Sequence, residues 1–175
     1  NAQEITPTLR HFYSVNGKLY ALPFNSNTVV VYVNKDLWKE RPFPTTWEDF
    51  ETASKEYKQN HGDQKLIAFG WLHGHLFDQI GAIHGVSLAT YNNGTQGSGK
   101  MDLTHDFWAA WLEILKRFYD AGYLDLTDQA GAEKLFNEGK IPFLAQGTGR
   151  LPFIKLDKDK VDVMMLPNVA SFARH

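Results

Sequence analysis

Cysteine is absent from this chain of 175 residues, which excludes disulfide bonds and thiolate metal sites. No apolar run reaches the roughly 18 residues that a membrane-spanning helix needs. An excess of charge is also missing, since 18 Lys and Arg residues stand against 20 Asp and Glu residues and the formal net charge is −2. Without a basic stripe, nucleic acid is not an expected partner. Residues 1–4 do not form a signal peptide, so the signal of an exported protein would lie outside this chain.

Aromatic residues, by contrast, are abundant. They make up 14% of the chain and include five Trp and twelve Phe. Aromatic side chains fill a core efficiently and also provide flat surfaces on which a ligand stacks. The length suffices for one sizeable core, and no repeat or linker divides the chain. We therefore expect a single folded unit.

Apolar residues recur with helical spacing in some segments and form short continuous runs in others, which predicts an α/β fold. A hairpin is expected at Asn16-Gly17, a capping box at Thr45 and Glu48, and a second helix cap at Thr104. The long helix at 105–121 is expected to bury Phe107, Trp108, Trp111, Leu112, Leu115, Phe118 and Tyr119. The other expected elements are strands at 28–34, 66–71, 141–145 and 161–166, helices at 46–59, 76–84 and 130–138, and a turn at 146–149.

Two segments near the start carry a family resemblance. Residues 22–36 form a polar turn and a β-branched strand that ends in Tyr-x-Asn-Lys-Asp, and residues 44–50 form a helix start with Thr46-Trp47. In this order they resemble the hinge region of the extracellular solute-binding proteins of ABC importers, the class that includes maltose-binding protein. Within the family, the chain is most similar to members that bind sn-glycerol-3-phosphate and glycerophosphodiesters. Motifs that extend this likeness lie at residues 23–26, 70–71, 84–85, 92–94, 136–139, 147–149 and 164–167.

The resemblance implies an α/β lobe of the two-lobe periplasmic-binding-protein fold, with its hinge strands. Because family members are longer, the resemblance implies that this chain is a piece of a longer protein. Residues 1–32 would belong to lobe one and the first crossover strand, 33–158 would form lobe two, and 159–175 would be a truncated second crossover strand. The implied function is non-enzymatic capture of a small polar solute, glycerol-3-phosphate or a glycerophosphodiester, and its delivery to ABC permease subunits without a cofactor. The implied location is extracytoplasmic, in the periplasm or lipid-anchored at the cell surface.

Three departures from the glycerophosphate-binding members weaken the solute assignment. Asn27 replaces the second residue of a Ser-Ser pair, Gly74 stands where a second Trp is expected, and residues 147–150 are Gly-Thr-Gly-Arg instead of Ser-Ser-Gly-Ser. A carbohydrate is therefore the alternative solute. A hydrolase on a phosphorylated or glycosidic substrate is the alternative from another class, but the sequence contains no recognisable carboxylate pair, Gly-x-Ser-x-Gly elbow or cysteine nucleophile.

Ligand-binding candidates lie in three turns next to strands. Residues 26–28 lie in a turn before a buried strand and either form local turn hydrogen bonds or bind a polar ligand. Trp71 follows a strand and is either a core side chain or a stacking platform for a sugar, glycerol or choline group. Residues 147–150 are either an ordinary strand-to-helix turn or an anion site with an arginine fork. The candidates are Ser26, Asn27, Trp71, Gly147, Thr148 and Arg150.

Other patterns are interpreted as structural. Residues 94–100 match Gly-x-x-x-x-Gly-Lys, but Met101 stands where a phosphate loop needs Ser or Thr. The side chains of His73, His75 and His84 lack the spacing of metal ligands, so we interpret them as polar surface or pocket-rim residues and expect no metal. If lobe one is missing, an apolar or aromatic patch stays open and is expected to drive self-association of the chain.

Overall fold

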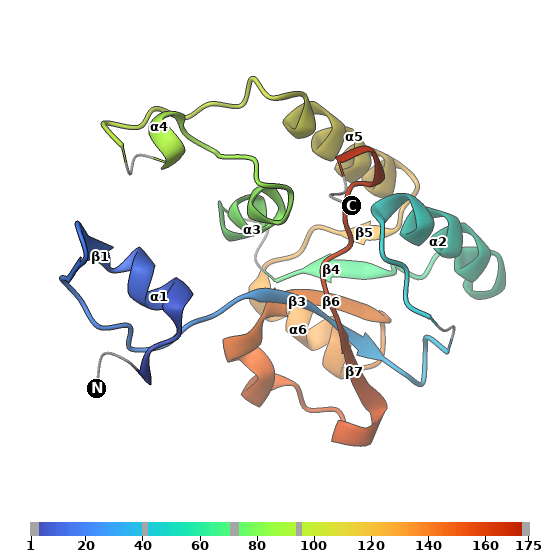
Figure 1. The fold of residues 1–175 in the computed structure, drawn as a ribbon. Coiled ribbons are helices and arrows are strands. Elements are labelled where there is room, and N and C mark those ends of the chain that lie inside the picture. Colours follow the sequence, from blue (N-terminus) through green and yellow to red (C-terminus); the bar gives the residue numbers. More distant parts are fainter. Residues whose placement is uncertain (1–3, 40–41, 71–73, 94–95, 173–175) are drawn as a thin grey trace.

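A five-stranded sheet forms the centre of the molecule (Figure 1). The computed structural model describes residues 4–39, 42–70, 74–93 and 96–172. The strands of this sheet are β3 (Val29–Asn34), β4 (Ile67–Phe69), β5 (Leu124–Asp125), β6 (Phe143–Gly147) and β7 (Val161–Met164). Their order is β5-β4-β6-β3-β7, in which β4 is parallel to β5 and β6 and β3 is antiparallel to β6 and β7.

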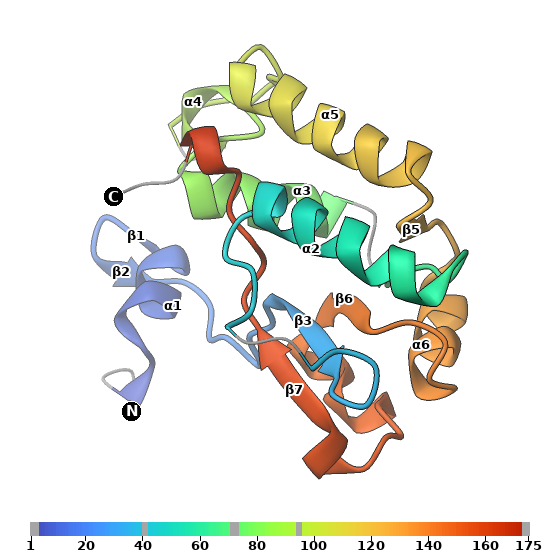
Figure 2. The ribbon, with the colours of Figure 1, turned by 90° about the vertical axis from the view of Figure 1, so that its right-hand side faces the viewer.

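Helices cover both faces of the sheet. The helices α2 (Trp47–His61), α3 (Gly74–His84) and α5 (Asp106–Asp120) lie on one face, and α6 (Gln129–Asn137) lies on the other, as Figure 2 shows. The predicted α/β class is thereby confirmed, with element ends shifted by a few residues. Shorter elements complete the chain: α4 (Thr90–Asn93), η2 (Thr148–Phe153), η3 (Lys158–Lys160) and η4 (Ala170–Phe172).

Strand β3 is buried along its whole length. Its odd-numbered residues join the cluster beneath α2, α3 and α5, whereas Val30 and Tyr32 join a smaller cluster beneath α6. This division follows from the alternation of side chains along a strand. Tyr32 is 2% exposed and donates its hydroxyl to the Gly147 carbonyl at 3.3 Å, and burial raises the pKa of its phenol. Both helical layers therefore pack on this one strand.

An aromatic cluster fills the space between the sheet and helices α2 and α5. Trp47 of α2 packs against Trp111 and Phe118 of α5, with ring centroids 5.1 and 5.6 Å apart. Phe50 meets Phe143 of β6 edge to face at 4.7 Å. All five rings are at most 1% exposed. Because full burial of a side chain such as Phe contributes about 1.5–3 kcal/mol, this cluster holds the two helices on the sheet.

The buried stripe of α5 is narrower than predicted. Trp108, Trp111 and Phe118 are buried as expected, but Leu112 is 49% and Tyr119 is 56% exposed. Their positions, one residue after Trp111 and Phe118, turn them about 100° away from the core-facing line. Ile114, which the prediction missed, is only 2% exposed because it lies three residues after Trp111 on the same face.

Both predicted helix caps are wrong by one residue. Thr46, not Thr45, caps α2, and its hydroxyl accepts from the Asp49 amide at 3.1 Å. The Thr45 carbonyl instead accepts from the Asn168 amide at 2.8 Å, so Thr45 belongs to a strand-like contact. The cap of α5 is His105, whose Nδ1 accepts from the Phe107 amide, and not Thr104. The Thr104 hydroxyl instead donates to Asp102 Oδ1 at 2.6 Å and is not available as a cap.

The predicted turn at 146–149 is replaced by two regular elements. β6 continues through Gly147, because Gln146 and Gly147 pair with Val30 and Val29 of β3. The six-residue 3₁₀ helix η2 then starts at Thr148. The antiparallel partner strand extends β6 beyond the apolar run that marked it in the sequence.

His84 of α3 forms hydrogen bonds with the segment that follows β7. We expected a surface or pocket-rim residue, but His84 is 5% exposed. Its Nε2 accepts from the Val169 amide at 3.1 Å, and its Nδ1 lies 3.1 Å from the Phe172 carbonyl. Since Nε2 accepts, Nδ1 carries the proton and donates to that carbonyl. The neighbouring Ala170 amide is bound by Glu48 of α2 at 3.0 Å.

We therefore predict that His84→Ala lowers the free energy of unfolding by about 1–3 kcal/mol, because it leaves a buried amide and a carbonyl unpaired. His84→Gln keeps one acceptor and one donor and should lose less. Urea denaturation followed by tryptophan fluorescence measures both variants. Equal losses in the two would contradict a hydrogen-bonding role.

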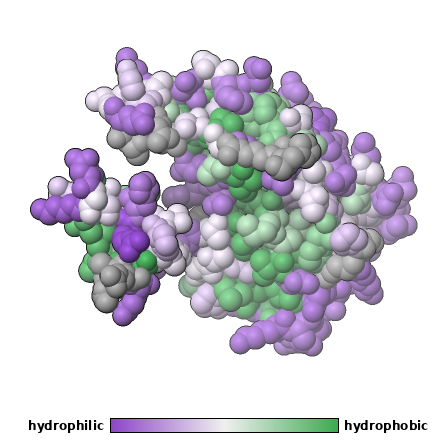
Figure 3. Space-filling view, viewed as in Figure 1, coloured by the Kyte–Doolittle hydropathy of each residue, from purple (hydrophilic) through white to green (hydrophobic). Residues whose placement is uncertain are grey.

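The N-terminal segment lies beside the body of the molecule. It contains α1 (Pro7–Phe12) and the predicted hairpin, β1 (Ser14–Val15) and β2 (Lys18–Leu19), with Asn16 and Gly17 in the left-handed region that a tight turn needs. Helix α1 has no buried residue. Figure 3 shows this segment apart from the main body, where apolar surface gathers over β7. Among the exposed apolar side chains of the segment are Phe12 (77%), Tyr20 (68%) and Phe24 (101%).

Exposed apolar groups of this kind are expected to drive self-association of the 175-residue chain. Replacing Phe12, Tyr20 and Phe24 together by Ser should shift the chain toward monomer in sedimentation velocity. As a matched control, replacing the exposed Leu112 and Tyr119 of α5 by Ser should change little. A wild-type chain that sediments as a monomer at every concentration would contradict the prediction.

Candidate functional site

Strand ends define the edge of the sheet where the candidate residues meet. The carboxyl ends of the parallel strands β4 and β6 lie at this edge, and β3, which is antiparallel, begins there. Crevices at the carboxyl ends of parallel strands are the usual ligand sites of α/β sheets. A polar cavity of about 340 Å³ opens at this position. Its lining residues are Asn27, Thr28, Val29, His75, Asp78, Gln79 and Ala82.

Helix α3 supplies one wall of the polar cavity, and the start of β3 supplies the other. The hydroxyl of Thr28 donates to Gln79 Oε1 at 3.0 Å and thereby joins the two walls. Because His75, Asp78 and Gln79 lie at spacings of three and four residues, they occupy one face of the helix. The wall formed by α3 therefore carries an imidazole, a carboxylate and an amide toward one polar space.

Asn27 joins the start of β3 to the end of β6. Its Oδ1 accepts from the Thr148 hydroxyl at 2.8 Å and from the Gly149 amide at 2.9 Å. The Thr148 amide donates to the Thr28 carbonyl at 2.8 Å. A Cβ on Gly147 would lie 2.7 Å from Asn27 Nδ2, so glycine is needed there for the close approach of the asparagine. The amides of residues 148 and 149, which could bind an anion, thus have protein acceptors.

Arg150 is held by a carboxylate beneath the site. Its Nε and a terminal nitrogen donate to the two oxygens of Glu133 at 2.7 and 2.8 Å, and its guanidinium lies 3.6 Å from the ring centroid of Phe153. The hydrogen bond to Glu133 raises the pKa of Arg150. Glu133 is 8% exposed and also accepts from the buried Gln146 at 3.1 Å. The arginine fork predicted for an anion is therefore engaged with an internal carboxylate.

The structure brings some of the predicted site residues together. Asn27 and Thr148 are in direct contact, and Gly147 lies against the Asn27 side chain. Ser26 is exposed beside them, and Arg150 faces Glu133. Trp71 lies outside the described residues, as does His73. The role of Trp71 as a ligand contact therefore stays a prediction, as do the ligand-binding roles of the other candidates.

Sequence reasoning missed two residues of the polar cavity, Asp78 and Gln79. The available signal was their spacing: together with His75 they form a polar strip on a helix that follows a strand end. The His75 side chain was predicted at a pocket rim and does line the cavity. Among the described residues, no group of three or more metal-ligating side chains is present. Met101 pairs with Ala89 in a β-bridge, which is not the helix that a phosphate loop would require after Lys100.

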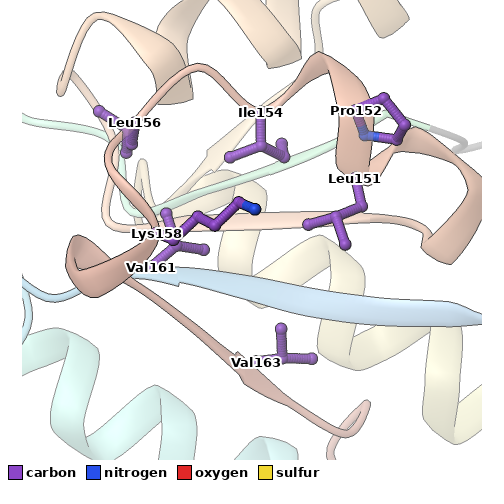
Figure 4. Close-up of a pocket in the computed structure, with 7 residues that line it drawn as sticks. All are labelled: Leu151, Pro152, Ile154, Leu156, Lys158, Val161 and Val163. Atoms are coloured by element: carbon purple, nitrogen blue, oxygen red, sulfur yellow. The ribbon is translucent and has the colours of Figure 1, made fainter.

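A larger cavity of about 530 Å³ lies elsewhere, between η2 and β7 (Figure 4). Its lining is aliphatic apart from Lys158, whose side chain extends between the surrounding apolar groups. None of the predicted ligand-binding residues contributes to it. A small polar solute needs several hydrogen-bonding partners, so we place the candidate site at the polar cavity instead.

The sheet, its helical layers and the polar cavity at the strand ends define an α/β module with a candidate site at the carboxyl ends of its parallel strands. The chain belongs to the bacterial extracellular solute-binding protein family, whose model matches residues 1–174. It is similar to the sn-glycerol-3-phosphate-binding periplasmic proteins of Shigella flexneri serotype 5b (strain 8401) and of Escherichia coli (strain K12), each 30% identical over 167 residues. These alignments cover 87% of this chain and 36% of each relative.

The chain thus spans little more than a third of the length of these relatives, at 36%. The comparison supports the class of solute-binding proteins of ABC importers, and the relatives are named as binding proteins. Within the described part of the chain, no helix has the length and apolarity needed to cross a membrane.

The contact between Gly147 and Asn27 gives a test of the site geometry. Gly147→Ala should lower the free energy of unfolding by about 1–3 kcal/mol, because the new methyl group forces Asn27 out of its hydrogen bonds. Gly149→Ala is the matched control, since the nearest atom to its Cβ is 3.6 Å away. Thermal unfolding measures both variants. The described packing would be contradicted if Gly149→Ala were the more damaging change.

Proposed function

We propose that this chain is part of the solute-binding component of an ABC importer that captures glycerol-3-phosphate or a glycerophosphodiester and delivers it to the permease. The observation that carries the proposal is the polar cavity between the start of β3 and α3, beside which Asn27 binds the β6–η2 junction. These three segments are far apart in the sequence, and each supplies hydrogen-bonding side chains. The proposed component is a binding protein without catalytic activity or cofactor, located outside the cytoplasm.

The proposed organisation has residues 1–32 belonging to lobe one and the first crossover strand, 33–158 forming lobe two, and 159–175 beginning the second crossover. The pairing of β3 with β7 supports it, because the two proposed crossover strands lie side by side in antiparallel register from Val31–Met164 to Asn34–Val161. Adjacent strands of this kind form a hinge about which two lobes close on a solute. The polar cavity would then face lobe one.

Support for a glycerophosphate comes from the names of the relatives and from the hydroxyl and amide groups of Ser26, Asn27 and Thr148 at the site. For a phosphate to bind Arg150, the guanidinium would exchange contacts with Glu133 for contacts with the ligand. Such an exchange replaces one charge-assisted pair by another. Trp71 is proposed as the stacking platform for the apolar side of the solute.

One observation favours the second candidate, a carbohydrate. The amides of Thr148 and Gly149 and the guanidinium of Arg150 already bond to protein acceptors. A neutral hydroxylated solute does not need to displace them. It could use the amide of Gln79 and the carboxylate of Asp78, together with an aromatic platform.

Calorimetric titration of the full-length protein with glycerol-3-phosphate, glycerophosphocholine and maltose tests both candidates. Trp71→Ala should weaken solute binding by about 1–3 kcal/mol, because a stacking surface is lost from a desolvated site. Arg150→Ala should weaken the binding of phosphorylated solutes and leave the binding of maltose unchanged. Lys55→Ala, on the exposed surface of α2, is the control for loss of one positive charge.

The effects of the two substitutions on the two kinds of solute distinguish the candidates. If Arg150→Ala leaves the affinity for glycerophosphate unchanged and Trp71→Ala abolishes sugar binding, the carbohydrate function replaces the phosphate one. A full-length protein that binds none of the three solutes would contradict the proposed function.

A further inference from the structure

The charge distribution around the polar cavity is unequal. Arg150, which does not line the cavity, is already paired with Glu133 through both carboxylate oxygens. On the α3 side, Asp78 lines the cavity and its side chain is exposed. Among the residues that the structure describes, none forms a hydrogen bond or an ion pair with the Asp78 carboxylate. The α3 wall therefore carries an uncompensated negative charge.

We infer that Asp78 is a specificity-determining residue of the polar cavity, which accepts hydrogen bonds from the hydroxyl groups of a solute and repels a phosphate group. This inference rests on the proposed function, since it assigns the orientation and the class of the solute bound at the same site. The solute places an uncharged, hydroxylated end against α3. A phosphate, where the solute has one, points away from Asp78.

The chemistry of a carboxylate supports this role. An ionised carboxylate is only an acceptor, so it pairs with hydroxyl donors and finds no donor on an ionised phosphate. Hydrogen bonds from hydroxyls to a carboxylate are short and charge-assisted. A phosphate bound beside Asp78 would be repelled, because two negative charges a few ångströms apart oppose each other.

The position of Asp78 makes the discrimination geometric as well as electrostatic. Thr28 binds Gln79 at 3.0 Å, which holds the neighbouring turn of α3 against the start of β3. His75 lies one turn before Asp78 and also lines the cavity. The carboxylate is therefore presented from a helix that is tied to the proposed hinge strand, and not from a loop.

Asp78→Asn in the full-length protein tests the inference, because asparagine has nearly the same shape and lacks the charge. Glu113→Gln, on the exposed surface of α5, removes the same charge far from the cavity. Calorimetric titration uses maltose as the neutral solute and glycerol-3-phosphate as the phosphorylated one. Thermal unfolding of both variants confirms that they are folded.

We expect Asp78→Asn to weaken the binding of maltose more than that of glycerol-3-phosphate, with a change of roughly 3- to 10-fold in the ratio of the two affinities, because both solutes lose hydrogen bonds to the carboxylate and only the phosphorylated one is relieved of repulsion. Glu113→Gln should change neither affinity. An unchanged ratio, a change of the opposite sign, or an equal effect of Glu113→Gln would overturn the inference and leave the proposed function intact. A wild-type protein that binds neither these solutes nor glycerophosphocholine would overturn both.

Discussion

The burial of β3 on both faces is the constraint on which the rest of this structure depends. The strand lies between β6 and β7 and runs against both of them. Its odd-numbered residues pack against the layer of α2, α3 and α5, and its residues Val30 and Tyr32 pack against α6. Because it is antiparallel, its first residues lie at the edge where β4 and β6 end. The same strand therefore organises the core and delivers Asn27 and Thr28 to the polar cavity.

The polar groups near this edge are hydrogen-bonded to one another, so they are not free donors for a ligand. Asn27 binds the start of η2, and Glu133 binds both Gln146 and Arg150. A buried carboxylate is stable when its oxygens are paired in this way. These contacts keep the β6–η2 junction in one conformation and leave the charge of Asp78 as the prominent one in the cavity. In the proposed function, solute recognition would then depend on the α3 side as much as on the glycine-rich turn.

Much of the fold was predictable from local patterns. The β-branched run of β3, the apolar spacing of α5 and the Asn16-Gly17 turn are signals contained within a few residues. The start of α2 was not, because Thr46 forms a β-bridge with Asn168, more than a hundred residues away in the sequence. The candidate site was predictable on the strand side and, on the helix side, for His75 alone. Asp78 and Gln79 carry no motif, and their role depends on the placement of α3 against β3.

The sequence by itself determined the α/β class, the family and the order of the elements, since periodicity and ordered motifs are one-dimensional properties. Tertiary structure alone decided which polar groups share a space and which are already engaged. His84 and Arg150 illustrate this: each resembles a surface or ligand-binding residue in the sequence, yet His84 is buried against the segment after β7 and Arg150 is paired with Glu133. A side chain's partners depend on chain segments brought together by folding, and residue type gives only the chemistry that those partners can use.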